Sequence, residues 1–189
     1  MNNEIQIAMR GILGTLGGTV LGWFLNTLSQ RGKLNIYISS WKDSFEYNNT
    51  GSMTPSCSIE QTECYGYNLS LDIYNNSGTT KIMRNIEVVF GKGKIELSQS
   101  IPKDDSTRRH SGPASFYDEI EPINIPPKTV IKVDMHEGFW KDALSFIWET
   151  DRVFLRYANE KNKKKKVLIK KEIYKDCFIN HRAEDTHNG

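Results

Sequence analysis

The sequence predicts a mainly β protein, an antiparallel two-layer β-sandwich preceded by one N-terminal transmembrane helix. Residues 11–30 contain no charged side chain. After Lys33 the apolar residues recur at every second position, which is the period of a strand with one buried face. Short runs of Asn, Gly and Pro separate these segments, and no long helical period lies between them.

The uncharged segment is long enough to cross a membrane. Twenty residues of helix rise about 30 Å, which is the thickness of a bilayer's hydrocarbon core. A cleaved signal peptide is the other interpretation, but no small-x-small cleavage pattern follows the apolar run. We therefore expect residues 1–32 to form a short tail and a transmembrane helix.

Four glycines gather on one side of this helix. At about 100° per residue, Gly11, Gly14, Gly18 and Gly22 fall within an arc of roughly 80°. A strip without side chains lets a second helix approach closely. Glycine is common in membrane helices, but the regular four-residue spacing of the last three favours a packing face. Its partner would be another transmembrane helix, either a second copy or a different membrane protein.

The charges that flank the helix predict its orientation. Arg10 lies on the amino side, whereas Arg31, Lys33 and Lys42 lie on the carboxyl side. Loops rich in Lys and Arg stay in the cytoplasm. The predicted location is therefore a membrane, crossed once, with the globular domain on the cytoplasmic side.

Residues 33–172 are expected to form the sandwich, with seven or eight short strands. Turn residues follow the second and third runs, at 75–78 (NNSG) and 91–93 (GKG), and Pro126-Pro127 precedes a later one. The alternating apolar runs are 34–38, 69–73, 86–90, 95–97, 131–135 and 153–157.

One segment of the body, residues 138–149, has a helical pattern. We expect it to lie over an open end of the sandwich, where Trp140, Phe146 and Trp148 would cover the core; an exposed interaction patch is the alternative. The last stretch, residues 173–189, loses all periodicity and is expected to be a polar C-terminal tail.

Three parts of the body resemble a known kind of domain. Residues 68–78 (NLSLDIYNNSG), 86–90 (IEVVF) and 123–128 (INIPPK) resemble bacterial membrane-anchored immunoglobulin-like or fibronectin-III-like accessory proteins, in which a strand ends in an Asn-rich turn and a late strand follows two prolines. The resemblance covers roughly residues 33–172. It implies an immunoglobulin-like sandwich that binds or scaffolds, and a protein that is not an enzyme.

The charge is small overall but uneven. The net charge is +2, and residues 160–175 hold eight lysines and two glutamates, so this segment carries +6 and the remainder −4. That balance excludes a globally basic nucleic-acid binder, and no nucleic-acid partner is expected. Lys161, Lys163, Lys164, Lys165 and Lys166 form either the solvated turn of a hairpin or a contact with anionic lipid, which would add about 1 kcal/mol per lysine.

The longest stretch without a pattern, residues 102–115, is polar. Arg108 and Arg109 make it either a contact loop for the carboxylates or phosphates of a protein partner, or a solvated linker. Its Asp, Ser and His residues do not predict catalysis, because a catalytic triad needs side chains held by separate rigid elements.

The cysteines and histidines predict no metal site or cofactor. Cys57 and Cys64 are seven residues apart, and no second pair has the spacing of a zinc site. They are either reduced thiols facing the cytosol or a bridge that closes a loop outside the cell.

The sequence as a whole predicts a single-pass, membrane-anchored β-sandwich that acts as a non-enzymatic interaction module. Its expected partners are the lipid bilayer, another transmembrane helix and a protein bound through the sandwich. The alternative is an oligomerising membrane effector, holin-like or toxin-like, whose glycine-faced helix disrupts the membrane.

Overall fold

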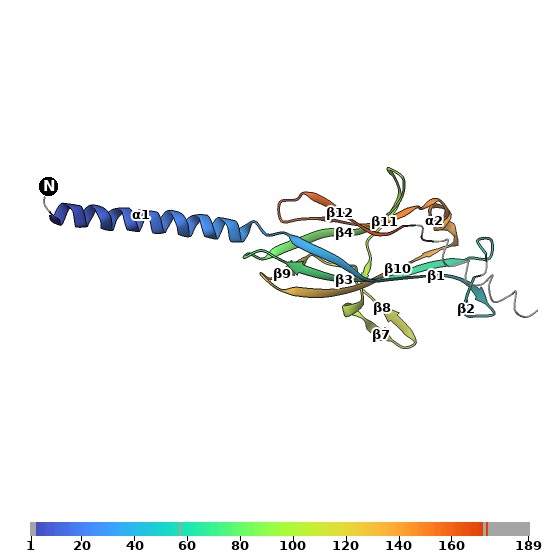
Figure 1. Cartoon of the computed structure of the whole chain (residues 1–189). Coiled ribbons are helices and arrows are strands. Elements are labelled where there is room, and N and C mark those ends of the chain that lie inside the picture. The colour runs from blue at the N-terminus through green and yellow to red at the C-terminus, as the bar shows by residue number, and fades with distance from the viewer. Residues whose placement is uncertain (1–2, 57, 172, 174–189) are drawn as a thin grey trace, which may run out of the picture.

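A long helix extends away from a β-rich body in the computed structural model, which describes residues 3–56, 58–171 and 173 (Figure 1). The helix α1 spans Asn3–Gln30. Its segment Arg10–Gln30 is 21 residues long, has a mean hydropathy of 1.2 and is not buried against the body. An apolar N-terminal helix is therefore confirmed. Its length and composition suit a membrane anchor, and they also suit a signal sequence.

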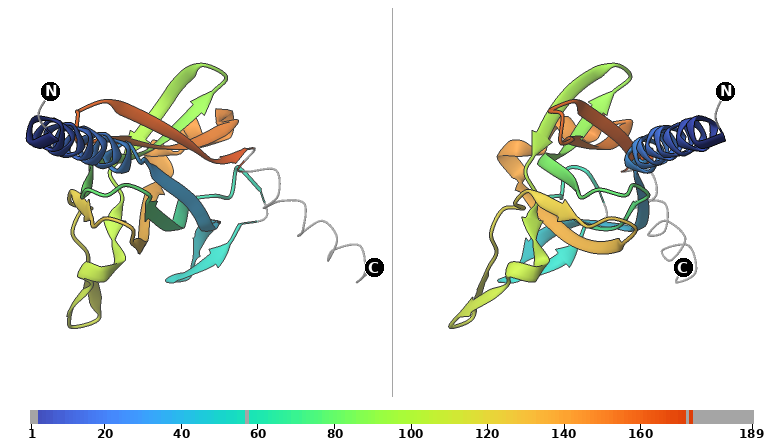
Figure 2. Two further views of the ribbon diagram at one scale, coloured as in Figure 1. Left: turned by 60° about the vertical axis from the view of Figure 1, so that its left-hand side comes forward. Right: turned by 90° about the vertical axis from the view of Figure 1, so that its left-hand side faces the viewer.

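The body consists of two antiparallel sheets packed face to face (Figures 1 and 2). This arrangement confirms the predicted two-layer sandwich. One sheet has the order β2-β1-β3-β10-β6 and the other the order β12-β11-β4-β5, with β9 paired to β4. The first sheet contains β1 (Leu34–Asn49), β2 (Ser52–Pro55), β3 (Cys64–Asn75), β6 (Lys103–Asp104) and β10 (Val130–Trp140). The second contains β4 (Lys81–Lys92), β5 (Ile95–Ser100), β11 (Arg152–Ala158) and β12 (Lys164–Lys171), flanked by β9 (Ile123–Ile125).

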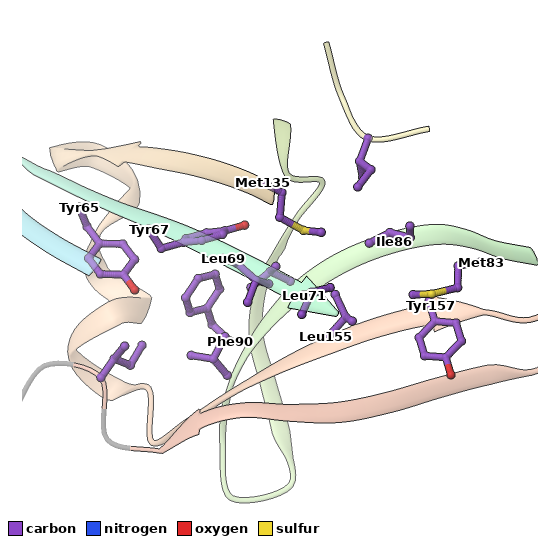
Figure 3. Close-up of a cluster of buried hydrophobic side chains, with 14 of the residues drawn as sticks. Tyr65, Tyr67, Leu69, Leu71, Met83, Ile86, Phe90, Met135, Leu155 and Tyr157 are labelled. Atoms are coloured by element: carbon purple, nitrogen blue, oxygen red, sulfur yellow. The ribbon is translucent and has the colours of Figure 1, made fainter. Parts of the chain in front are cut away.

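The core lies between the two sheets and follows the predicted alternation (Figure 3). On β3, Leu69, Leu71 and Ile73 are at most 1% exposed, and Val88 and Phe90 on β4 are fully buried. Burying an apolar side chain of this size stabilises the fold by about 1.5–3 kcal/mol. Interdigitation of these side chains is what holds the two layers together.

In the predicted strand at 95–97, the two apolar residues Ile95 and Leu97 do not both face the core. Ile95 is 67% exposed. The register of β4 and β5 shifts between the pairs Phe90–Ser98 and Gly91–Glu96, which leaves Leu97 as an extra residue. An extra residue reverses the facing of the strand beyond it, so the alternation in the sequence does not continue across the bulge.

The predicted helix at 138–149 is shorter than expected. Strand β10 continues to Trp140, and the helical part is a 3-10 turn η2 (Lys141–Ala143) followed by α2 (Ser145–Glu149). Phe146 and Trp148 pack against the core, as predicted. The prediction for Trp140 is wrong: its side chain is 64% exposed. It follows Phe139 on a strand, so the two side chains point to opposite faces.

Candidate functional site

The end of α1 is attached to the turn between β3 and β4 by backbone hydrogen bonds. The Gly78 N–H donates to the Ser29 carbonyl (2.9 Å), and the Asn76 N–H donates to the Lys33 carbonyl (3.2 Å). These bonds lie on either side of the point where the helix gives way to β1. The helix therefore enters the sandwich in a fixed direction.

The contact is close enough to require glycine at position 32. A Cβ atom on Gly32 would overlap the Asn76 carbonyl and lie 2.5 Å from the Ser77 Cα, both of which belong to the main chain. A Cβ on Gly78 would instead meet the Ser29 hydroxyl, which can rotate away. Gly32 is thus the position at which the junction tolerates no side chain.

A buried asparagine holds the turn itself. Asn75 and Ser77 are fully buried. The Asn75 Nδ2 donates to the carbonyls of Thr79 (2.8 Å), Ile125 (2.9 Å) and Pro126 (3.0 Å). Its Oδ1 accepts from the Ser77 N–H (2.9 Å) and hydroxyl (2.7 Å). One side chain therefore joins the β3–β4 turn to the last residue of β9 and the residue that follows it.

The lysine run lies at the same end of the sandwich as this junction (Figure 1). It belongs to the β11–β12 hairpin, as predicted, but its boundaries differ. Lys164, Lys165 and Lys166 are the first residues of β12, so only Lys161 and Lys163 lie in the turn. The sequence predicts that the whole run forms the turn. Three of its lysines lie in the strand instead, because the hydrogen-bonded ladder with β11 extends to the pair Ala158–Lys164.

The hairpin turn and the end of α1 enclose a hollow of about 770 Å³. Thr27 and Gln30 of the helix line one side, and Asn159 of the turn lines the other. Glu160 is the acidic residue among the lining side chains. The basic residues that line it are Arg31, Lys33, Lys81, Lys161, Lys163 and Lys165.

The two remaining lysines of the run face elsewhere. Lys166 forms an ion pair with Glu96, which also binds Arg156 (2.6 Å). The hydrogen bonds from Lys166 and Arg156 lower the pKa of Glu96. Lys164 lines a separate small hollow beside Arg156 and Glu87. Strand alternation therefore divides the run into two chemically different groups.

The glycine strip of α1 is uncovered. Apart from the adjoining residues and the backbone of the helix itself, no atom of the described chain lies within 4 Å of a Cβ built on Gly11, Gly14, Gly18 or Gly22. The strip is open to a second helix.

Arg108 and Arg109 lie at the base of a small projecting hairpin (Figure 2). The prediction of an irregular segment is wrong here: residues 102–115 include β6, a 3-10 turn η1 (Asp105–Thr107) and β7 (Arg109–Ser111), which pairs with β8 (Ala114–Phe116). Arg109 forms an exposed ion pair with Asp118 (2.5 Å). Arg108 donates to the Ser115 hydroxyl at 3.4 Å.

One side-chain pairing beside this hairpin does not follow from the sequence pattern. Asp105 and the imidazole of His136 on β10 are hydrogen-bonded, and the Tyr117 ring packs edge-on against that imidazole at 4.4 Å between centroids. Asp105 and His136 are 31 residues apart, and no spacing rule connects a loop with the middle of a strand. In the described part of the chain, no three His, Cys, Asp or Glu side chains gather as a metal site would require.

The comparison with protein families identifies the body. The model of the YopI Ig-like domain matches residues 32–170. The chain belongs to the YopI Ig-like domain family. It is 26% identical, over 177 residues, to the SPbeta prophage-derived uncharacterized protein YopI of Bacillus subtilis strain 168, covering 89% of this chain and 98% of that protein.

Solved structures resemble the chain only distantly. The X-ray structure of the structural-genomics target SoR45 aligns with 72% of this chain and 82% of its own, at 9% identity and a TM-score of 0.36. Nothing about the function of this YopI-family protein follows from a likeness of that size. The family match supports the immunoglobulin-like part of the predicted resemblance.

Cys64 of this YopI-family domain is a free, partly buried thiol at the start of β3. Burial, and secondly the Glu46 carboxylate, raise the pKa of Cys64, so the thiolate is scarce at neutral pH. Cys57 lies outside the described residues, as do 174–189 of the predicted tail. Ile173, the first residue of that tail, is fully buried in the core.

Proposed function

We propose that the chain is a single-pass membrane protein whose Ig-like domain acts as a non-enzymatic interaction module on the cytoplasmic side. The observation that carries this proposal is the uncovered apolar surface of α1. Leu13 and Trp23 are each 68% exposed, and none of the segment Arg10–Gln30 is buried by the body. An exposed apolar surface of this extent needs lipid or another apolar partner.

The polar side chains within α1 support a location in lipid. The hydroxyls of Thr15, Thr19 and Thr27 donate to main-chain carbonyls four residues earlier, at 2.9, 2.9 and 2.8 Å. Each hydroxyl hydrogen is therefore bonded within the helix itself. In a bilayer core, where no water is present, such internal bonds are the ones that remain available.

The distribution of charge supports the orientation. Arg31 and Lys33 follow the helix directly, and the folded domain brings Lys161, Lys163 and Lys165 to the same end. On the other side, Arg10 is the basic residue of the described chain next to the apolar segment. A cytoplasmic domain places the larger positive charge against the anionic leaflet.

Two surfaces are available for partners under this proposal. The glycine strip of α1 would pair with another transmembrane helix. The β7–β8 hairpin, with its exposed residues and Arg108 and Arg109 at its base, would contact a protein. A hairpin that projects from a rigid sandwich is a common location for binding residues.

Membrane insertion and orientation can be tested on the full chain with one introduced cysteine. Lys94 lies exposed in the β4–β5 turn; Lys94→Cys, in a variant whose three native cysteines are serine, supplies a labelling site. We expect the protein to float with liposomes, and an impermeant maleimide to label it in lysed cells but not in intact cells. A soluble chain, or a product that has lost the first 32 residues, would show that α1 is not an anchor.

Pairing through the glycine strip can be tested with Gly18→Leu. We expect dimer crosslinking in membranes to fall roughly fivefold or more, because a side chain on the strip holds the helices apart at a cost of about 1 kcal/mol or more. Gly17→Leu is the matched control, since Gly17 lies on another face of the same helix. Equal crosslinking in the two variants would exclude the strip as the interface. If the wild-type chain arrests growth when it is expressed, and Gly18→Leu relieves that arrest, the oligomerising effector would be favoured instead.

A further inference from the structure

The hollow between α1 and the β11–β12 hairpin is a strongly basic concave surface. Its lining includes six basic side chains and one acidic side chain, a net charge of +5. The hollow opens beside Gln30, at the end of the apolar helix. If α1 spans a bilayer, this position lies at the level of the lipid headgroups.

We propose that this hollow binds the phosphodiester headgroup of an anionic membrane lipid, an inference that rests on the proposed function of α1 as a membrane anchor. The uncharged polar groups of the lining, Thr27, Gln30 and Asn159, suit the hydroxyls that such a headgroup carries beside its phosphate. Lipid, rather than a soluble anion, is favoured because the wall of the hollow is partly the anchor itself.

The lysines of the hollow are available for a ligand. In the described part of the chain, Lys161, Lys163 and Lys165 have no carboxylate within ion-pair distance, and all three are exposed. By contrast, Lys166, in the same run, is paired with Glu96. Within the lysine run, the three lysines that face the hollow therefore have no carboxylate partner in the described part of the chain.

The turn that carries these lysines is held in place before any ligand binds. The Asn159 Oδ1 accepts the N–H groups of Lys161 (3.1 Å) and Lys163 (2.9 Å). At the back of the hollow, Lys81 forms a partly buried ion pair with Glu160 (2.9 Å). Partial burial raises the pKa of Glu160, but the hydrogen bonds from Lys81 and from the main chain outweigh it and lower that pKa. The ordered turn reduces the conformational entropy lost on binding.

The two groups of lysines provide a matched pair of variants. Lys163→Gln/Lys165→Gln removes two cations from the hollow, whereas Lys164→Gln/Lys166→Gln removes two cations of the same run that do not line it. The full chain in neutral detergent micelles would be titrated with a short-chain phosphatidylglycerol, with native mass spectrometry counting bound lipid. We expect the first variant to lose affinity at least about tenfold and the second to stay within about twofold of wild type.

Three results would overturn the headgroup site. Equal losses in both variants would show attraction by net charge alone. Phosphatidylcholine that binds as tightly as phosphatidylglycerol would show no selectivity for an anionic lipid. Inorganic phosphate that binds as tightly would show a soluble-anion site. Thermal melting of both variants checks that each is folded. The titration does not depend on orientation in a cell, so its failure is distinguishable from failure of the flotation and labelling test.

Discussion

Asn75→Ala is expected to destabilise the domain by about 3–5 kcal/mol. The asparagine is fully buried, and its amide bonds three main-chain carbonyls and two groups of Ser77. Alanine fills part of the space but removes all five of these hydrogen bonds. The Thr79 and Pro126 carbonyls still accept from the hydroxyls of Ser77 (2.7 Å) and Thr129 (2.8 Å). The groups most affected are therefore the buried Ser77 N–H and the Ile125 carbonyl. Each buried polar group that loses its partner costs about 1–3 kcal/mol. Urea unfolding of the full chain in micelles, followed by tryptophan fluorescence, measures the loss.

Two neighbouring substitutions make this result specific. Asn76→Ala removes an exposed side chain whose Oδ1 accepts only from Lys128 (3.2 Å), so we expect a loss below about 1 kcal/mol. Asn75→Asp keeps the acceptor for Ser77 but places a carboxylate against three carbonyl oxygens. The folded state would raise the pKa of the introduced carboxyl, so stability should fall as pH rises above about 4. A loss for Asn75→Ala no larger than that for Asn76→Ala would contradict the assigned role.

The role of Asn75 shows which part of the fold was predictable from sequence. Residues 75–78 have the composition of a turn, and the structure confirms the turn. The burial of Asn75 was not predictable, because asparagine is usually exposed and two of its acceptors, Ile125 and Pro126, lie 50 and 51 residues away. Local chemistry identifies a turn, but only the assembled sandwich determines what the turn packs against.

The same limit applies to the strands and to the candidate site. The alternation of apolar residues correctly predicted which face of β3 is buried, because that strand is regular throughout. The same alternation gave a wrong prediction for Ile95, because β5 contains a bulge opposite Gly91. The lysine run was visible as a patch of charge. The division that directs Lys163 and Lys165 to the hollow and Lys166 to Glu96 depends on where β12 begins.

Gly32→Ala is expected to loosen the junction between α1 and the sandwich. The added methyl group would overlap the main-chain atoms of Asn76 and Ser77, which cannot rotate away as a side chain can. We expect a destabilisation of about 3 kcal/mol, at the upper end of overpacking effects. The local readout is hydrogen exchange: the amides of Asn76 and Gly78, which donate to Lys33 and Ser29, should lose protection.

Two other glycines provide the controls for this substitution. Gly17 lies on the uncovered helix, where a Cβ would meet no atom beyond the adjoining residues and the helix backbone within 4 Å. Gly17→Ala should therefore leave both amides protected. In Gly78→Ala the added methyl group would be too close only to the Ser29 hydroxyl, which can rotate, because the Ser29 Cβ and carbonyl oxygen lie at an ordinary contact distance of 3.5 Å. The effect should be small. The hollow uses side chains from both sides of the junction, so Gly32→Ala should also weaken phosphatidylglycerol binding although it changes no charge. Protected amides and unchanged lipid affinity in Gly32→Ala would show that the helix is tethered to the domain without being positioned by it.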